Sequence, residues 1–212
     1  MEKIFTNYKA FFLLIIVILL WGINPVKAQV ASTWSAGLEV GPGFARYDGD
    51  AENHDFKAGV IAGGFLTYSV VNTFGITGKV LFSQKGSRFS DNGTRVKQTL
   101  DYLEVPVLGR FFLNREGRFR PNIFIGPSFG FLLGVKNKRG NGENVKIPAD
   151  ERDNISEFDL GITGGLGLNY EILNETRILI DARYTHGLSD IIDPGEFNNR
   201  GIGVTIGMSF GL

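Results

Sequence analysis

The sequence contains no cysteine and only two histidines, His54 and His186. A chain without cysteine has neither disulfides nor thiolate-metal sites, so a packed core or a membrane has to stabilise it. The scarcity of histidine restricts any histidine-based metal site or acid–base pair to those two positions. These absences exclude a disulfide scaffold and a zinc-thiolate protein, and they leave few routes to catalysis.

Long apolar runs are also lacking. The longest, Phe11–Trp21, has 11 residues, well below the roughly 20 that a transmembrane helix needs. It follows Lys3 and Lys9 and precedes Ala28, which is the three-part layout of a secretory signal. We therefore predict that residues 1–28 are a cleaved signal peptide and that residues 29–212 form one domain. The alternative, an uncleaved membrane anchor, would require a longer run.

No charge of one sign dominates, because 22 basic residues face 22 acidic ones. Removing the signal takes away three lysines and one glutamate, which leaves 19 basic and 21 acidic residues. A slightly acidic domain gives no reason to expect nucleic acid as a partner.

The chain is instead rich in glycine, with 29 residues, and in phenylalanine, with 18. The phenylalanine, together with frequent leucine and isoleucine, argues against the disorder that glycine alone would suggest. Apolar and small residues alternate through residues 201–212, a period of two that is typical of a β-strand. Similar patterns predict eight strands: 34–45, 58–70, 75–85, 99–113, 123–135, 160–172, 177–187 and 201–212.

Short and long connections alternate strictly between these strands. Residues 71–74, 114–119 and 171–176 are short connections, whereas residues 46–57, 86–97, 136–157 and 188–199 are long and polar, with a hairpin signal at Asn92-Gly93. This alternation predicts an all-β fold, an eight-stranded antiparallel transmembrane β-barrel with short periplasmic turns and longer extracellular loops, in the cell outer membrane. A soluble lipocalin-like barrel or sandwich remains the alternative.

Eight charged residues fall within the predicted strands, on the face opposite the apolar stripe. An eight-stranded barrel is too narrow for a wide channel, so we expect these four acids and four bases to pair with one another and fill the lumen. A path for protons or small ions through the same network is the functional alternative. The residues are Glu39, Lys79, Lys85, Glu104, Arg110, Asp159, Asp181 and Arg183.

Three sequence stretches carry a family resemblance. They are Tyr102-Leu103-Glu104-Val105-Pro106, Phe82-Ser83-Gln84-Lys85-Gly86, and the segment from Ala182 to Ile191. In this order they resemble landmarks of the PorT-like outer-membrane β-barrel proteins, and the resemblance covers the whole mature chain. It implies a non-enzymatic outer-membrane barrel, and for some members an association with protein secretion.

Three further site hypotheses arise from the loops. Residues 48–55 are rich in carboxylates but lack the spacing of an EF-hand, so a solvated acidic loop is favoured over a calcium site. His186 precedes Asp190 and Asp193, which is the only arrangement suggestive of an enzyme at the rim, and no nucleophile motif accompanies it. Lys136, Lys138 and Arg139 could bridge lipopolysaccharide phosphates, against the alternative of a mobile soluble loop.

The sequence thus favours a non-enzymatic structural or interaction barrel without catalytic residues, metal or cofactor. Its expected partners are outer-membrane lipid and lipopolysaccharide, and proteins reached through the extracellular loops or a secretion machinery. A narrow porin-like pore for small solutes or ions is the main alternative, and a rim-located enzyme is the weaker one.

Overall fold

The computed structural model describes residues 33–49, 55–91, 94–139, 144–145, 154–173, 175–191 and 197–212. The predicted signal peptide, residues 1–28, lies outside these ranges. Ten strands are present: β1 (Thr33–Gly49), β2 (Asp55–Val71), β3 (Phe74–Lys85), β4 (Ser87–Asp91), β5 (Thr94–Phe112), β6 (Phe119–Arg139), β7 (Asn144–Val145), β8 (Phe158–Leu173), β9 (Thr176–Gly187) and β10 (Phe197–Gly211). No helix in the described part of the chain is long and apolar enough to cross a membrane.

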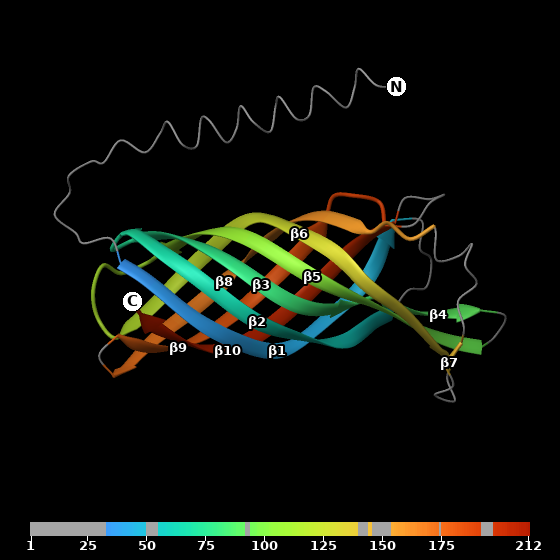
Figure 1. The fold of residues 1–212 in the computed structure, drawn as a ribbon, viewed down its shortest axis with the longest axis horizontal. Coiled ribbons are helices and arrows are strands. Elements are labelled where there is room, and N and C mark those ends of the chain that lie inside the picture. The colour runs from blue at the N-terminus through green and yellow to red at the C-terminus, as the bar shows by residue number, and fades with distance from the viewer. Residues whose placement is uncertain are drawn as a thin grey trace, which may run out of the picture. The chain divides into compact units, whose positions relative to one another are not determined.

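The eight long strands form a closed antiparallel barrel (Figure 1). Each strand pairs with the next long strand along the chain, and β1 pairs with β10 over 13 residue pairs, which closes the cylinder. The two short strands, β4 and β7, extend one end of the barrel beside β5 and β6 (Figure 1). The predicted eight-stranded antiparallel barrel is therefore confirmed.

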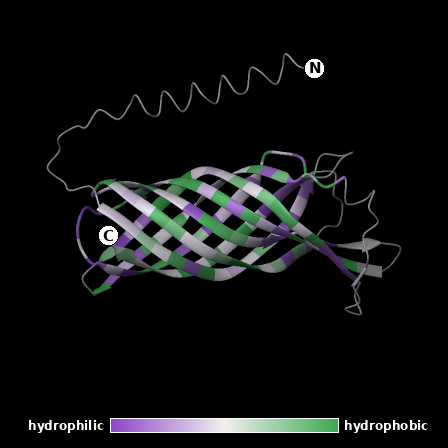
Figure 2. Cartoon of the chain, in the orientation of Figure 1, coloured by the Kyte–Doolittle hydropathy of each residue, from purple (hydrophilic) through white to green (hydrophobic). Residues whose placement is uncertain are grey.

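Alternation of side chains gives the wall two different faces, as the banding along each strand in Figure 2 shows. In β10, for example, Val204, Ile206 and Met208 are 45, 56 and 42% exposed, whereas Thr205 and Ser209, at odd-numbered positions of the same strand, are buried. Successive strand residues point to opposite faces, so the exposed apolar set lies on the exterior and the buried set in the lumen. The wall is thus apolar outside and largely polar inside.

The two ends of the barrel differ. We call the end with the connections β2–β3, β5–β6 and β8–β9 the turn rim, and the opposite end the loop rim. At the turn rim, Gly117 (φ 107°) lies in the β5–β6 connection, a backbone conformation that glycine adopts without strain. Aromatic side chains gather there, including the neighbouring rings of Trp34 and Tyr68, whose centroids are 4.8 Å apart.

The predicted strand bounds are too short at the loop rim. The range 86–97, expected to be a loop, contains β4 and the start of β5, where Asp91 pairs with Thr94. Likewise β1 continues to Gly49, β6 to Arg139, and β10 begins at Phe197. The reason is that these outer segments keep pairing beyond the apolar belt, where no lipid-facing alternation marks them as strand.

The loop rim also holds the main apolar cluster of the barrel. Tyr47, Leu100 and Tyr102 point inward from β1 and β5, and two residues outside the strands, Ile155 and Ile191, pack onto them. The backbone N–H of Ser156 donates a hydrogen bond to the carbonyl of Ile191, which joins the two connections. We call these five residues the apolar cap, because they pack together as a buried apolar cluster at this rim.

Candidate functional site

The eight predicted lumen charges are all inside the barrel, and each of them forms an ion pair. Their side chains are 9% exposed or less. They divide into two groups, one nearer each rim. Both groups contain two acids and two bases, so each is neutral by itself.

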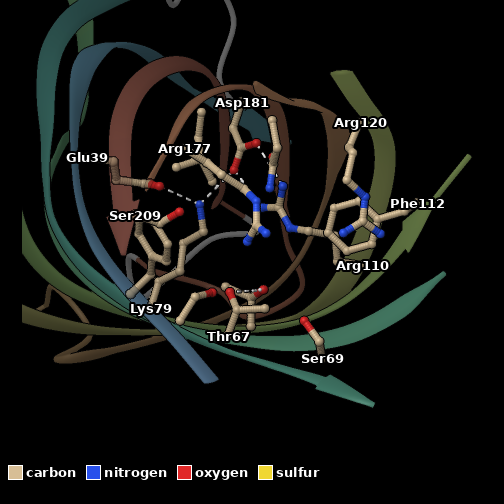
Figure 3. A pocket seen from close by; sticks show the side chains of 15 residues that line it. Glu39, Thr67, Ser69, Lys79, Arg110, Phe112, Arg120, Arg177, Asp181 and Ser209 are labelled. Atoms are coloured by element: carbon tan, nitrogen blue, oxygen red, sulfur yellow. Dashed lines mark hydrogen bonds and ion pairs between the residues drawn. The ribbon is translucent and has the colours of Figure 1, made fainter. Parts of the chain in front are cut away.

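The first group, Glu39, Lys79, Arg110 and Asp181, is the turn-side tetrad (Figure 3). Asp181 accepts two hydrogen bonds from Arg110, at 3.0 and 2.7 Å, and one from Lys79 at 2.9 Å. Lys79 also donates to Glu39 at 2.6 Å. The side chains come from β1, β3, β5 and β9, so the tetrad spans the lumen and joins strands on different sides of the barrel.

The second group, Lys85, Glu104, Asp159 and Arg183, is the loop-side tetrad. Lys85 lies 3.1 Å from Asp159 and 3.5 Å from Glu104, and Arg183 lies 3.3 Å from Glu104. Ser128 donates a further hydrogen bond to Glu104 at 3.0 Å, and Asn199 donates one to Asp159 at 2.9 Å. A buried carboxylate is stabilised when several hydrogen-bond donors or cations contact its oxygens, and this holds for both Glu104 and Asp159.

Inward glycines make room for these long side chains. A Cβ atom on Gly167 would lie 2.4 Å from Asn122 Oδ1, 2.6 Å from Asp181 Oδ1 and 2.7 Å from Arg110 Nη1. A Cβ on Gly165 would similarly lie 2.6 Å from the ring of Phe124. The glycines on the inward face therefore are packing partners of the charged and aromatic side chains rather than the lining of an open channel.

Aromatic and amide side chains complete the network, and the sequence pattern alone did not identify them. Phe124, an apolar residue on the inward face, lies 4.7 Å from the Arg110 guanidinium and 6.0 Å from Lys79 Nζ. Asn122 accepts a hydrogen bond from Arg110 at 2.7 Å. Cation–π contacts of this kind stabilise a desolvated cation, which explains an inward phenylalanine among charges.

Lys57 is a fifth inward cation of the lumen, which the sequence analysis had placed at the end of a loop. Its side chain is 1% exposed, and its Nζ donates a hydrogen bond to the backbone carbonyl of Lys85 at 3.1 Å. The signal that could have found it is the phase of β2, in which Lys57, Ile61, Phe65 and Thr67 alternate toward the lumen.

The described residues leave little free space beside the two tetrads. One cavity borders the turn-side tetrad and another the loop-side tetrad, and each has a volume of about 20 Å³. A buried water needs roughly 10–15 Å³ of such space, so each cavity has room for one water molecule and at most two. Figure 3 shows the turn-side cavity crossed by Lys79, Arg110 and Arg177.

The geometry gives no support to the calcium site or to the enzyme at the rim. His186 lies on the exterior face, where its ring stacks on Tyr184 at 6.5 Å, and His54 and Asp193 are outside the described residues. Of the carboxylates in the range 48–55, Asp48 pairs with Arg200 at 2.5 Å. Within the described ranges, no group of three or more His, Cys, Asp or Glu could hold a metal ion.

A closed barrel with an apolar exterior and a polar, filled interior is the architecture of small outer-membrane barrels. The family model described as "outer membrane protein beta-barrel domain" matches residues 27–193, and the chain belongs to this family. The protein is therefore an integral barrel of the cell outer membrane, and the predicted localisation is confirmed. The turn rim is periplasmic and the loop rim extracellular.

Solved structures of small outer-membrane barrels are similar in fold. Neisserial surface protein A is 11% identical, with 82% of this chain and 96% of that chain covered and a TM-score of 0.51. Ail of Yersinia pestis is 17% identical, covers 83% and 98%, and has a TM-score of 0.47. Outer membrane protein W of E. coli is 11% identical, covers 87% and 100%, and has a TM-score of 0.44. No curated protein matches the chain.

Proposed function

We propose that this protein is a closed, non-enzymatic structural or interaction barrel that acts through its rims and loops. The observation that carries the proposal is the filled lumen. Two neutral tetrads leave cavities of about 20 Å³ each, and the apolar cap packs at the extracellular end. A solute that entered from either side would meet paired charges or packed side chains.

The energetic cost of opening this lumen supports the proposal. An ion that passes the turn-side tetrad has to separate Asp181 from Arg110 and Lys79, which are held by three hydrogen bonds. Removing one partner from a buried ion pair costs about 3–5 kcal/mol. A barrier of that kind at two successive levels disfavours steady conduction through the barrel.

Planar-bilayer recording tests this function. We expect the purified, refolded protein to give no discrete conductance steps at neutral pH in about 1 M salt. Open porins conduct strongly at this salt concentration, and a porin in the same membrane is the positive control. Reproducible steps that require the folded protein would contradict the proposal.

A narrow pore for small ions is the second candidate, and one specific observation favours it. Glu39 Oε1, Arg183 Nη1 and Thr205 Oγ1 are buried in the lumen without a hydrogen-bond partner among the described residues. Such groups are ordinarily bonded to ordered water, so water reaches more than one level of the lumen. Conductance that rises with salt and vanishes in the Arg183→Gln variant would support this pore instead.

We also propose that the protein is PorT-like and that its partners are a secretion machinery and the lipids of the outer membrane. The PorT-like sequence landmarks support an association with protein secretion machinery, which in vivo cross-linking from the two rims followed by identification of the captured proteins would test. Outer-membrane lipid and lipopolysaccharide surround the exterior. A His186→Ala variant that retains every cellular phenotype of the protein would support the non-enzymatic assignment, whereas loss of a hydrolytic activity would contradict it.

A further inference from the structure

A row of cations crosses the extracellular extension of the barrel. Arg88 of β4 lies directly opposite Lys97 of β5, and Lys97 lies directly opposite Lys138 of β6. Residues directly opposite one another share a face of the sheet, and like charges in such pairs are destabilising. None of the three forms an ion pair with another described residue. Among the described residues only Asp55, opposite Arg88, offers the row an acidic cross-strand partner. A row of like charges with so little compensation from the described part of the chain indicates an anionic partner.

Nearby groups increase the positive charge of this region. Lys57, on the inner face, is repelled by both Lys97 and Arg88 and attracted by Asp101. Lys136 reaches Asp101 at 2.7 Å, yet its side chain remains 65% exposed. On the exterior, Arg88, Lys97, Lys138 and Lys136 are thus four neighbouring cations, of which Lys136 pairs with Asp101 and Arg88 lies opposite Asp55.

The row faces the exterior of the barrel. Gln98 accepts a hydrogen bond from the inward Tyr47 at 2.6 Å, so its neighbour Lys97 points to the opposite face. Lys138 shares that face through its pairing with Lys97, and it is exposed. A ligand on this surface would thus approach from the surrounding membrane rather than through the lumen.

The height of the row matches the outer headgroup region. On β6 the exterior apolar surface ends at Leu133, which is 58% exposed, and Lys136 and Lys138 follow three and five residues later. A strand tilted by about 40° rises about 2.5 Å along the barrel axis per residue, which places the two lysines about 8 and 12 Å beyond Leu133. Both lysines therefore lie beyond the hydrocarbon, at the level of the outer-leaflet headgroups and just outside it, where phosphate groups of a glycolipid are within reach of their side chains.

We propose that Arg88, Lys97, Lys138 and Lys136 form a binding surface for the phosphate groups of lipopolysaccharide. This inference rests on the proposed function, in which the exterior and the rims carry the contacts. The guanidinium of Arg88 can engage a phosphate with two parallel hydrogen bonds, and the lysines add mobile point charges. The acyl chains of the same lipid would then cover the apolar exterior below Leu133.

The test compares two variants with the same loss of charge in the full mature chain. Lys97→Gln/Lys138→Gln removes two members of the row, whereas Arg115→Gln/Arg118→Gln removes two cations from the β5–β6 turn at the periplasmic rim. Each protein is reconstituted into phosphatidylcholine nanodiscs, and binding of purified lipopolysaccharide is titrated. Because a cation near an anionic surface contributes about 1 kcal/mol, we expect about 30-fold weaker binding for the first variant and no change for the control.

Two further arms identify the ligand. Dephosphorylated lipopolysaccharide is expected to bind as weakly to the wild-type protein as intact lipopolysaccharide binds to the Lys97→Gln/Lys138→Gln variant. Inorganic phosphate and a soluble sulfated polysaccharide are not expected to compete at equal phosphate or sulfate concentration. Equal binding of the dephosphorylated lipid, full competition by the soluble polyanion, or unchanged affinity of the variant would each overturn the proposal.

Folding is monitored in the same samples by circular dichroism. If the double variant does not fold, the single Lys138→Gln variant replaces it, with an expected loss of about fivefold. This test and the conductance test can fail separately. Conductance steps from a protein that still binds lipopolysaccharide would refute only the closed lumen. A protein that does not conduct, and whose Lys97→Gln/Lys138→Gln variant binds lipopolysaccharide unchanged, would refute only the phosphate-binding surface.

Discussion

Replacing Asp181 with asparagine is the most direct test of how the lumen is held together. Asp181 is 1% exposed and accepts hydrogen bonds from both Arg110 and Lys79. Asparagine keeps nearly the same shape but removes the negative charge. The variant leaves two buried cations with one buried acid, Glu39, which contacts Lys79 at 2.6 Å.

The expected destabilisation follows from this imbalance. Removing one partner of a buried ion pair costs about 3–5 kcal/mol, because the remaining charge loses its compensation without regaining water. The double variant Asp181→Asn/Arg110→Gln restores neutrality, since Lys79 and Glu39 remain paired. We therefore expect the double variant to be more stable than Asp181→Asn alone, with a coupling energy of about 1–3 kcal/mol.

Reversible urea unfolding in lipid vesicles measures these free energies. Trp34, the only tryptophan after the predicted signal peptide, reports unfolding by fluorescence from the periplasmic rim. Glu171→Gln is the control, because it breaks the Arg177–Glu171 pair, whose side chains are 28 and 33% exposed, and such pairs contribute about 0–1 kcal/mol. If Asp181→Asn costs no more than the control, the lumen is hydrated and the closed-barrel reasoning is wrong.

Three other predictions concern packing and processing. Gly167→Ala should destabilise the barrel by about 1–3 kcal/mol, since its Cβ has no room beside the tetrad, whereas Gly78→Ala, with nothing within 4 Å of its Cβ, should cost less than 1 kcal/mol in the same unfolding assay. Ile191→Ala should speed proteolytic cleavage at the extracellular rim while the barrel stays folded, and Leu188→Ala, at a 53% exposed position, should not. Mass spectrometry of the protein from outer membranes should find Gln29 as its first residue; an intact residue 1 would contradict the signal peptide.

The barrel could be predicted from the sequence because the membrane imposes a simple rule on every strand. Each exterior position must be apolar over the height of the hydrocarbon, so strands such as 201–212 alternate without interruption. The rule ends where the lipid ends. Residues 96–98 and 46–48 remain in the sheet, yet their exterior side chains are the charged Lys97, Arg46 and Asp48, which is why the outer strand ends were misplaced.

The same alternation predicts that the eight charged side chains point into the lumen, but it does not predict which of them pair. Lys79 and Asp181 are 102 residues apart in sequence and meet only because β3 and β9 face one another across the lumen. Pairing across a lumen depends on the shear and radius of the closed barrel, and the sequence of a single strand determines neither. For the same reason, strand alternation alone does not predict the contact between the inward ring of Phe124 and the guanidinium of Arg110.

The division of the eight charges into two neutral groups limits where this protein can meet its partners. Because each tetrad balances itself, neither needs a counter-ion from solution, and neither leaves a net charge that would draw a soluble ion through the barrel. The exterior between the rims is apolar and is covered by lipid. On the exterior face, described cations without an ion pair gather beyond the hydrocarbon, most clearly in the row of Arg88, Lys97 and Lys138. Substitutions that change partner affinity without changing stability are therefore expected at the rims, whereas lumen substitutions should change stability first.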